Sequence, residues 1–309
     1  MKAWHRKLLI DTAKAAIPFQ GTLRRLKRRF SPYFPNPENT DGLVADGLEQ
    51  IDMLRDAGIR IEGADVLEFG SGWLPVIPLL FRLAGAKSVT LTDQERLLDE
   101  RLVGAAATII EDRKAYIAVR LGEKNSEREI TESMVAARTG GSIESQMSRC
   151  GFRYFVPFVP AWVPDRSIDI VISRAVLEHV PEPELHDFMR HFHRILKPQG
   201  AMCHTVDMSD HWEHRDKSIG RINFLRYSDP AWKLTCLNPQ NFQNRLRRCD
   251  YVHGVERAGF QIIKLVGESD PQALADFDAM PIARKFSGLT REEAAILRCS
   301  IVGTPIAHL

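Results

Sequence analysis

Short apolar runs alternate with helix-spaced apolar residues along most of this chain. Runs bounded by turn residues predict buried strands, at residues 64–70, 88–93, 153–156, 167–173, 201–207, 260–266 and 299–305. Between them, apolar residues recur every three or four positions, most clearly at residues 40–58, 74–83 and 183–196. This alternation predicts an α/β fold with a mostly parallel sheet that is covered by helices on both faces.

Two long stretches fall outside this alternation. About sixty residues separate the second and third predicted strands, whereas a crossover connection needs far fewer, so we expect a helical insertion at about residues 104–150. A stretch at about 208–250 is rich in Trp, Asn and Arg without a regular period and predicts a lid. The proline-rich segment Ser31–Thr40 predicts a linker. The chain therefore divides into a basic arm with its linker, residues 1–38, and one domain, residues 39–309.

Charge is concentrated at the N-terminus. Residues 1–30 hold nine Lys and Arg against one acid, which leaves 33 basic and 39 acidic residues for the rest of the chain. Apolar and basic positions alternate in this arm, as in a basic amphipathic helix that lies on an anionic membrane surface. An arm that packs its apolar side on the body explains the pattern equally well. The mildly acidic body argues against nucleic-acid binding.

Composition favours a globular protein of the reducing cytoplasm. The chain is 44% hydrophobic, enough for one large core, and its five cysteines are scattered without a C-x-x-C pair. This argues against a disulfide framework or a zinc site. No apolar run is long enough to span a membrane, and we expect no secretory signal. If the arm binds membrane, the protein would lie on the inner face; the oligomeric state is not indicated.

A glycine turn follows the first predicted strand. Gly70 and Gly72 flank Ser71, and glycine there lets the backbone turn sharply and approach a ligand without a Cβ in the way. The next helix presents free N–H groups and the positive end of its dipole, which suit a carboxylate or phosphate. The spacing is not the G-x-G-x-x-G of dinucleotide sites, and many parallel sheets use glycine in such turns only for packing.

Two acids accompany this turn. Glu68 lies in the strand two residues before Gly70, where a buried carboxyl needs a polar partner. Asp93 ends the second strand and is placed to accept hydrogen bonds from a ribose diol. Asp93 also suits the N-cap of the following segment, and the two roles are compatible.

The motifs together resemble those of class I S-adenosylmethionine-dependent methyltransferases. E-F-G-S-G at residues 68–72, the acid at 93, S-I-D-I-V-I-S-R-A-V-L-E-H-V at 167–180 and L-K-P-Q-G at 196–200 stand in that family's order. The chain is most similar to small-molecule enzymes of the type 11/12 kind, over roughly residues 66–207. It departs from the pattern at Leu74, where the loop's third glycine usually stands, in L-K-P-Q-G for L-K-P-G-G, and in the long insertion.

The resemblance implies both a topology and a cofactor site. It implies a Rossmann-like, seven-stranded, mostly parallel sheet whose last strand is antiparallel. It implies that S-adenosyl-L-methionine is the cofactor, with its ribose on Asp93 and its adenine near residues 157–162. The cofactor-binding residues that we assign are Glu68, Gly70, Ser71, Gly72, Asp93 and Ser173.

Three residues are candidate catalytic groups. His179 closely follows the fourth strand, and its ordinary pKa near ~6.5 suits a general base. Glu178 is its neighbour, and His211 follows the fifth strand. Each of the three also has a possible structural role, because a residue at such a position can begin a helix or form hydrogen bonds with backbone groups. His211-x-x-His214 beside Asp207 and Asp210 invites a metal interpretation, but a lid loop with capping acids explains the run, and we expect no metal site.

The favoured function is methyl transfer from S-adenosylmethionine to a small-molecule, lipid-linked or glycan acceptor, with O-methylation preferred. The aromatic and amide-rich lid suits a ring or a sugar, through Trp212, Phe224, Tyr227, Trp232, Asn241, Asn244 and Arg245. Its aromatic residues equally suit a small core of the lid's own, which is the favoured interpretation for Phe224. A degenerate fold that serves as a binding or scaffold protein is the alternative. A nicotinamide dehydrogenase is disfavoured because Pro75 stands where its third glycine is required.

Overall fold

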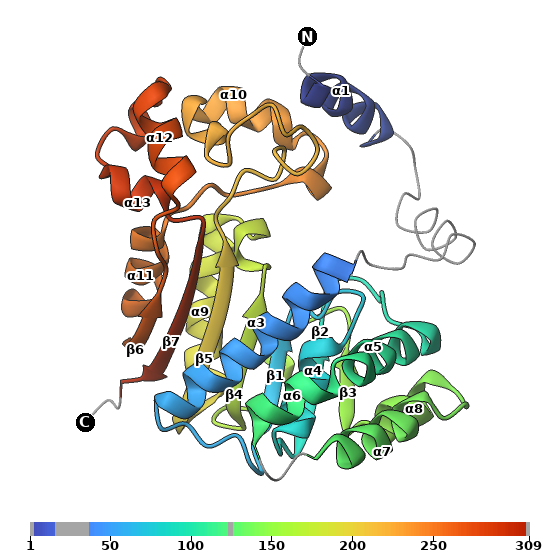
Figure 1. Ribbon diagram of the computed structural model, residues 1–309. Coiled ribbons are helices and arrows are strands. Elements are labelled where there is room, and N and C mark those ends of the chain that lie inside the picture. The colour runs from blue at the N-terminus through green and yellow to red at the C-terminus, as the bar shows by residue number, and fades with distance from the viewer. Residues whose placement is uncertain (1–2, 16–36, 123–125, 307–309) are drawn as a thin grey trace.

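A seven-stranded sheet forms the centre of the protein, in the order β3-β2-β1-β4-β5-β7-β6 (Figure 1). The computed structural model describes residues 3–15, 37–122 and 126–306. Its strands are β1 (Asp65–Phe69), β2 (Ser88–Thr92), β3 (Phe152–Phe155), β4 (Ile168–Arg174), β5 (Leu196–Asp207), β6 (Phe260–Val266) and β7 (Arg298–Pro305). β7 runs antiparallel to both β5 and β6, and the other neighbouring pairs are parallel. The predicted mostly parallel sheet with an antiparallel last strand is confirmed.

Six helices cover one face of the sheet. They are α3 (Pro37–Asp56), α4 (Val76–Leu83), α5 (Glu100–Asp112), α6 (Lys114–Leu121), α7 (Glu127–Arg138) and α8 (Ile143–Arg149). Ile117, Ile130 and Met134 of the inserted helices are buried in the same core as Val66 of β1. The expected insertion therefore extends this layer instead of forming a separate unit.

α3 begins earlier than the sequence pattern indicated. The segment Ser31–Thr40 was predicted as a linker, but Pro37 already stands at the start of the helix. Proline is tolerated there because the first turn of a helix has no use for its missing N–H. Residues 16–36, which hold the rest of the predicted linker and much of the arm, lie outside the described residues.

Helices α9 (Glu182–Ile195) and α11 (Arg248–Arg257) lie against the other face. α9 buries its predicted apolar stripe, including Leu185, Met189 and Phe192, against Leu67 and Met202 of the sheet. Burial of such side chains contributes about 1.5–3 kcal/mol each, which holds the ends of β4 and β5 in fixed positions.

A second, smaller core lies beyond the carboxyl end of β5. We call it the cap lobe; it comprises residues 208–247 and 271–297, with α10 (Asp229–Lys233), α12 (Pro271–Ala279) and α13 (Arg291–Ala295) (Figure 1). Phe224 is fully buried there beside Trp232 and Leu297. The lid predicted at 208–250 thus folds together with residues 271–297, which follow β6 in the chain. The lid also ends earlier than 250, because Arg248 already begins α11.

The N-terminal helix α1 (Ala3–Ala15) lies on the cap lobe. The Trp4 side chain is only 3% exposed, its ring centroid is 5.7 Å from that of Trp212, and its backbone N–H donates to Asp216 Oδ2 at 3.0 Å. For this part of the arm, the structure supports contact with the body. Leu9 and Ile10, by contrast, are 62% and 54% exposed.

Arg247 connects the two segments of the cap lobe. Its fully buried guanidinium donates to the carbonyl oxygens of Met208, Ala294 and Ile296. We expect Arg247→Met to lower the free energy of unfolding by about 3–5 kcal/mol, because three buried carbonyls lose their donor. Urea denaturation followed by circular dichroism measures this loss. Arg257→Met, at an exposed position on α11, is the control, and equal stability of the two variants would contradict this account.

Candidate functional site

The glycine turn is tied to the neighbouring strand by backbone hydrogen bonds. The N–H groups of Gly70 and Ser71 both donate to the carbonyl oxygen of Thr92, at 3.0 and 2.8 Å. The Thr92 N–H in turn donates to Ser71 Oγ at 3.0 Å, and its hydroxyl donates to the Glu68 carbonyl. The turn is therefore fixed to the carboxyl ends of β1 and β2, where ligands bind in open parallel sheets.

Gly70 and Gly72 occupy conformations that side chains rarely adopt, with φ of +77° and +62°. A Cβ at Gly70 would lie 2.5 Å from Val176 Cγ2, a distance that real Cβ atoms do not reach. A Cβ at Gly72 would meet nothing within 4 Å. Glycine is thus required at 70 for both backbone and space, and at 72 for the backbone alone.

Asp93 holds the turn through the protein backbone. Its Oδ2 accepts from the Gly72 N–H at 2.9 Å, and its Oδ1 accepts from the Gln94 N–H at 2.7 Å. The second bond is the capping contact expected from the sequence. The ribose contact of Asp93 stays a prediction, because its side chain is beside the cavity described below and is not part of its wall.

Glu68 is 5% exposed, and one of its carboxylate oxygens has no hydrogen-bond partner among the described residues. Burial raises its pKa to about 8, against the opposing effect of a hydrogen bond from Ser71. A neutral carboxyl at this place can donate a hydrogen bond as well as accept one.

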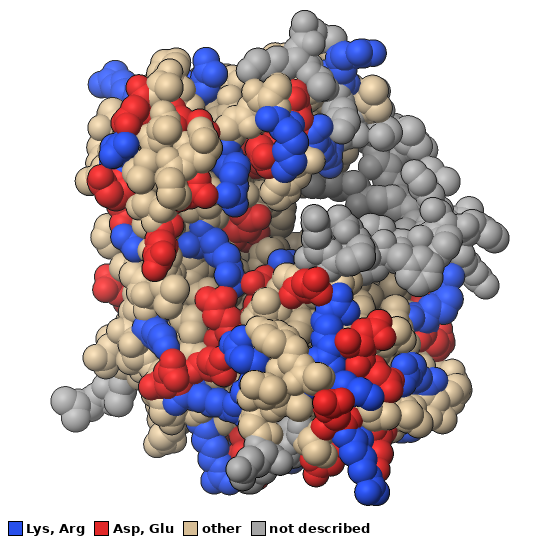
Figure 2. Space-filling view, in the orientation of Figure 1, with Lys and Arg blue, Asp and Glu red and all other residues tan. Residues whose placement is uncertain are grey.

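A cavity of about 610 Å³ opens between the glycine turn and the cap lobe. Figure 2 shows the molecule hollowed between these two parts, with acidic and basic side chains at the rim. The volume lies in the range of cofactor and small-molecule sites. Its walls come from α3, the turn, the ends of β4 and β5 and the start of β7: Gly42, Leu43, Asp46, Glu68, Gly70, Ser71, Gly72, Trp73, Leu74, Ile77, Arg174, Ala175, Val176, Thr205, Asp207, Ser209, His214, Arg221, Leu297 and Arg298.

Sequence reasoning missed an ion-pair cluster that borders this cavity. Asp46 of α3 pairs with Arg174 at the end of β4, at 2.7 Å, and with Arg298 of β7, at 2.8 Å. Ala175 next to Arg174 has φ of +53°, an unusual value for a residue with a side chain. The fourth motif contains Arg174, but its partners Asp46 and Arg298 come from distant segments, so the sequence does not mark these ion pairs.

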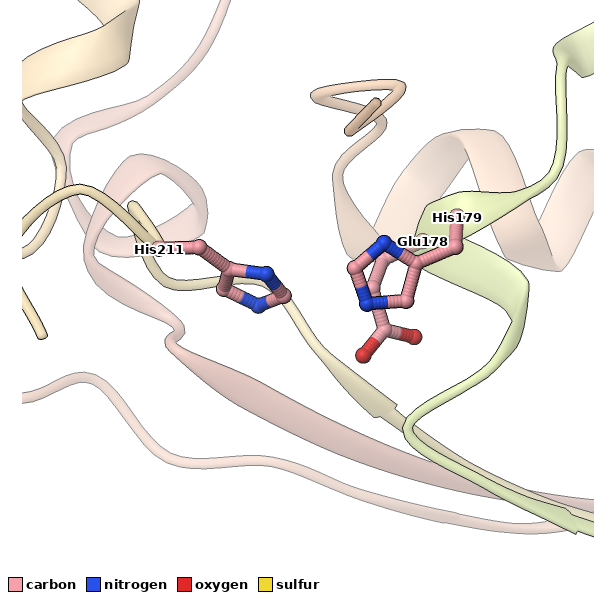
Figure 3. Close-up of side chains that lie close together, drawn as sticks. All are labelled: Glu178, His179 and His211. Carbon is pink, nitrogen blue, oxygen red and sulfur yellow. The ribbon is translucent and has the colours of Figure 1, made fainter. Parts of the chain in front are cut away.

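The three candidate catalytic side chains lie together (Figure 3). Glu178 and His179 belong to the 3-10 helix η2 (Leu177–His179) after β4, and His211 belongs to the segment after β5. One potential ligand atom from each side chain lies within 4.8 Å of those of the other two. The ring centroids of the two histidines are 5.0 Å apart. Sequence reasoning named each residue separately, and the fold joins them into one group, the Glu178–His179–His211 trio.

Hydrogen bonding defines the state of this trio. His179 Nδ1 is 2.8 Å from the Phe242 carbonyl oxygen, which can only accept, so the proton is on Nδ1 and Nε2 presents a lone pair. Burial raises the pKa of Glu178 well above its ordinary value, and the negative charge of Asp207 adds to this rise. The backbone N–H groups of Glu178 and Asp207 and the positive charge of Arg174 oppose it. Burial alone would raise the pKa of Asp207 as well. The His211 ring at 3.4 Å and hydrogen bonds from Ser209 outweigh that effect and hold the pKa of Asp207 below its usual range.

Ser173 has a different position from the other assigned cofactor residues. It is 1% exposed, its hydroxyl is 2.8 Å from His204 Nδ1, and its carbonyl accepts from the side chain of Gln50. This places it inside the sheet layer and outside the cavity wall, because the outward-facing residue at the end of β4 is Arg174.

Most of the lid residues proposed to select the acceptor have structural contacts instead. Asn244 donates to the carbonyl oxygens of Leu177 and Val180, which fixes the turn that carries the trio. Arg245 donates to the Phe224 and Tyr227 carbonyl oxygens. Of the seven residues named, only Trp212 and Asn241 line a smaller cavity beside the trio.

Comparisons with known proteins show the family to which the chain belongs. A family model described as a methyltransferase domain matches residues 20–265. Similar solved structures include an S-adenosylmethionine-dependent methyltransferase from Mesorhizobium loti, with 13% identity, 82% of this chain and 96% of that chain covered, and a TM-score of 0.45. Another is magnesium protoporphyrin IX methyltransferase from Synechocystis PCC 6803 with bound SAH, with 14% identity, 93% and 95% covered, and a TM-score of 0.43. No curated protein matches the chain.

The chain belongs to the methyltransferase-domain family, and within it to the class I S-adenosylmethionine-dependent enzymes. Its cofactor is S-adenosylmethionine. The residues present fit this cofactor: the turn offers backbone without Cβ atoms at Gly70, Glu68 has a buried oxygen without a partner, and Arg174 brings a positive charge to the wall of a cavity of suitable size.

Proposed function

We propose that the protein transfers the methyl group of S-adenosylmethionine to an oxygen of a small or lipid-linked molecule. The observation that carries this proposal is the position of the Glu178–His179–His211 trio. The 610 Å³ cavity and the smaller one beside the trio, about 280 Å³, share His214 as a lining residue. An acceptor that extends from one cavity into the other would bring its hydroxyl between the cofactor site and the trio.

The residues of this chain would have three tasks in the reaction. The cofactor supplies, when bound, an electrophilic sulfonium methyl group. The glycine turn and Arg174 hold the methionine end, and the cap lobe closes the cavity against water, which fixes the acceptor behind the methyl carbon. The trio acts on the acceptor hydroxyl and promotes the loss of its proton, since a neutral hydroxyl is a weak nucleophile.

Methyl transfer from isotope-labelled S-adenosylmethionine to metabolite and lipid extracts tests the proposal. Mass spectrometry should show products heavier by one labelled methyl group. Alkaline hydrolysis and fragmentation then show whether the label is on oxygen. Label on nitrogen or carbon would contradict O-methylation, and no label on any extract component would favour the alternative, a degenerate fold that binds a partner. That alternative has one observation in its favour: Leu74 lines the cavity where this family usually has glycine.

We further propose that the N-terminal arm brings the enzyme to anionic membranes, where a lipid-linked acceptor is found. No helix among the described residues is long and apolar enough to cross a membrane. Leu9 and Ile10 project from α1 while Trp4 anchors the same helix on the cap lobe. This leaves an apolar edge next to a basic sequence.

Changing both Leu9 and Ile10 to Glu is expected to reduce binding to vesicles that contain anionic lipid by about 10-fold or more, because apolar burial and charge attraction are both lost. Vesicle sedimentation measures the bound fraction. Val119→Glu, which alters an apolar residue on α6 that is even more exposed, is the control. Equal sedimentation of the unaltered chain and the arm variant would remove the membrane proposal.

A further inference from the structure

Glu178 is the most unusual side chain of the site. It is 1% exposed, and neither carboxylate oxygen makes a hydrogen bond of normal geometry within the described residues. Figure 3 shows its carboxylate next to the His179 ring, with the His211 ring nearby. A buried carboxyl without partners costs free energy, so a native structure that keeps one calls for an explanation.

The two histidines present nitrogen atoms to the same space. His179 Nδ1 is engaged with the Phe242 carbonyl oxygen, which leaves Nε2 free as a ligand. A backbone carbonyl on the other ring nitrogen is the usual support of a metal-bound histidine. His211 Nε2 has no hydrogen-bond partner among the described residues, and Asp207 Oδ2 lies 3.4 Å from it. Two imidazoles and one carboxylate are thus gathered on a side of the site that is open to solvent, since His179 is exposed.

The surroundings leave room for further ligands. The cavity of about 280 Å³ beside the trio is lined by His179, His211, Trp212, His214, Arg215, Asn241 and Gln243. His214 stacks on His211 with centroids 5.3 Å apart and also lines the large cavity. The one cationic lining residue, Arg215, has its guanidinium carbon 5.1 Å from the centre of the Trp212 ring.

We propose that Glu178, His179 and His211 bind a divalent transition-metal ion. Two histidines and a carboxylate with open positions form a donor set that suits Mn²⁺, Fe²⁺, Co²⁺ or Zn²⁺ better than Mg²⁺ or Ca²⁺, which prefer oxygen ligands. The ion would satisfy the carboxylate oxygens that the protein leaves without partners. Sequence reasoning considered a metal at His211 and His214 and rejected it, because a lid loop with capping acids explains that run. The contribution of Glu178 and His179 is visible only in the folded chain.

The role that we assign to the metal ion rests on the proposed methyl transfer. The acceptor oxygen would take an open position on the ion, which lowers the pKa of the hydroxyl, and its proton would leave to water. The oxygen lone pair then forms a bond to the methyl carbon. The carbon–sulfur bond breaks with its electron pair on sulfur, which yields the methyl ether or ester and S-adenosylhomocysteine.

Cation binding can be measured without cofactor or acceptor. The full chain, freed of any histidine tag and treated with chelator, is titrated with Zn²⁺ by calorimetry and with Co²⁺ by visible absorption. We expect one ion per chain and visible bands typical of cobalt with nitrogen ligands. Glu178→Gln and His211→Ala should each weaken binding by at least about 100-fold, and Asp207→Asn, beside His211, by about 10- to 100-fold. His253→Ala, an exposed histidine on α11, should bind as the unaltered chain does.

The outcomes separate this inference from the proposed function. Absence of binding, or equal binding by the trio variants, overturns the metal site; thermal unfolding of both variants shows that they are folded. Full methyl transfer by the chelator-treated chain also overturns it and leaves the proposed function standing. Metal binding at the trio without methyl transfer to any acceptor would support the metal site and contradict the proposed function.

Discussion

Replacing Glu178 by glutamine is expected to reduce the turnover number by about 10²- to 10⁴-fold while the affinity for S-adenosylhomocysteine stays unchanged. Glutamine has nearly the same shape, so the fold is retained, but it cannot carry negative charge toward His179 and His211. Glu178 lies outside the wall of the large cavity, so the cofactor keeps its contacts. Initial rates of methyl transfer with saturating cofactor measure the first effect, and calorimetry measures the second.

Two further variants test this prediction more closely. His179→Ala should lose turnover to a similar extent, because its Nε2 faces the same space as the Glu178 carboxylate. His253→Ala should react at the unaltered rate. Full activity of Glu178→Gln would show that the trio is structural, and loss of cofactor binding in that variant would show that the two sites are not separate.

Gly70→Ala is expected to abolish measurable cofactor binding and to lower the free energy of unfolding by about 2–5 kcal/mol. The positive φ costs a side chain about 1–2 kcal/mol, and overlap with the Val176 side chain adds about 1–3 kcal/mol. The turn can relieve this overlap only by moving away from β4, which moves its N–H groups relative to the cavity. Calorimetry with S-adenosylhomocysteine and urea denaturation measure the two losses.

The neighbouring glycine supplies a matched control. Gly72→Ala brings the same positive-φ strain without a clash, so we expect the smaller loss of about 1–2 kcal/mol. Adding Val176→Ala to Gly70→Ala removes the overlap and should restore part of the stability and the binding. If Gly70→Ala and Gly72→Ala behaved alike, the contact with Val176 would have no importance for the site.

The local parts of this site could be predicted from the sequence. Gly70, Gly72 and Asp93 are encoded in short motifs, because a turn between strand and helix is decided by a few neighbouring residues. The strands and α9 could be predicted from the periodicity of apolar residues, since burial on a sheet or helix face needs that spacing. The order of the motifs along the chain then indicated the methyltransferase family.

The long-range parts could not be predicted. The Asp46–Arg174 and Asp46–Arg298 ion pairs join residues more than a hundred positions apart, and no local pattern marks such pairs. The cap lobe takes its second segment from beyond β6, so its core residues have no common period. For the same reason, the sequence gives no means of placing Trp212 in that core, whereas the core position favoured for Phe224 is confirmed. Glu178, His179 and His211 were each recognised by residue type, but their proximity depends on how β4 and β5 end.

Calorimetric titration of the chain with S-adenosylhomocysteine, beside Asp93→Ala, tests the central claim most directly. Asp93 fixes the Gly72 N–H and is the predicted ribose contact. We expect one site per chain in the unaltered protein and binding at least about 10-fold weaker in the variant, since hydrogen bonds to a charged group contribute about 1.5–3 kcal/mol. Failure of the unaltered chain to bind, or equal affinity of the two proteins, would contradict the assignment of the turn at residues 70–72 and Asp93 as the cofactor site.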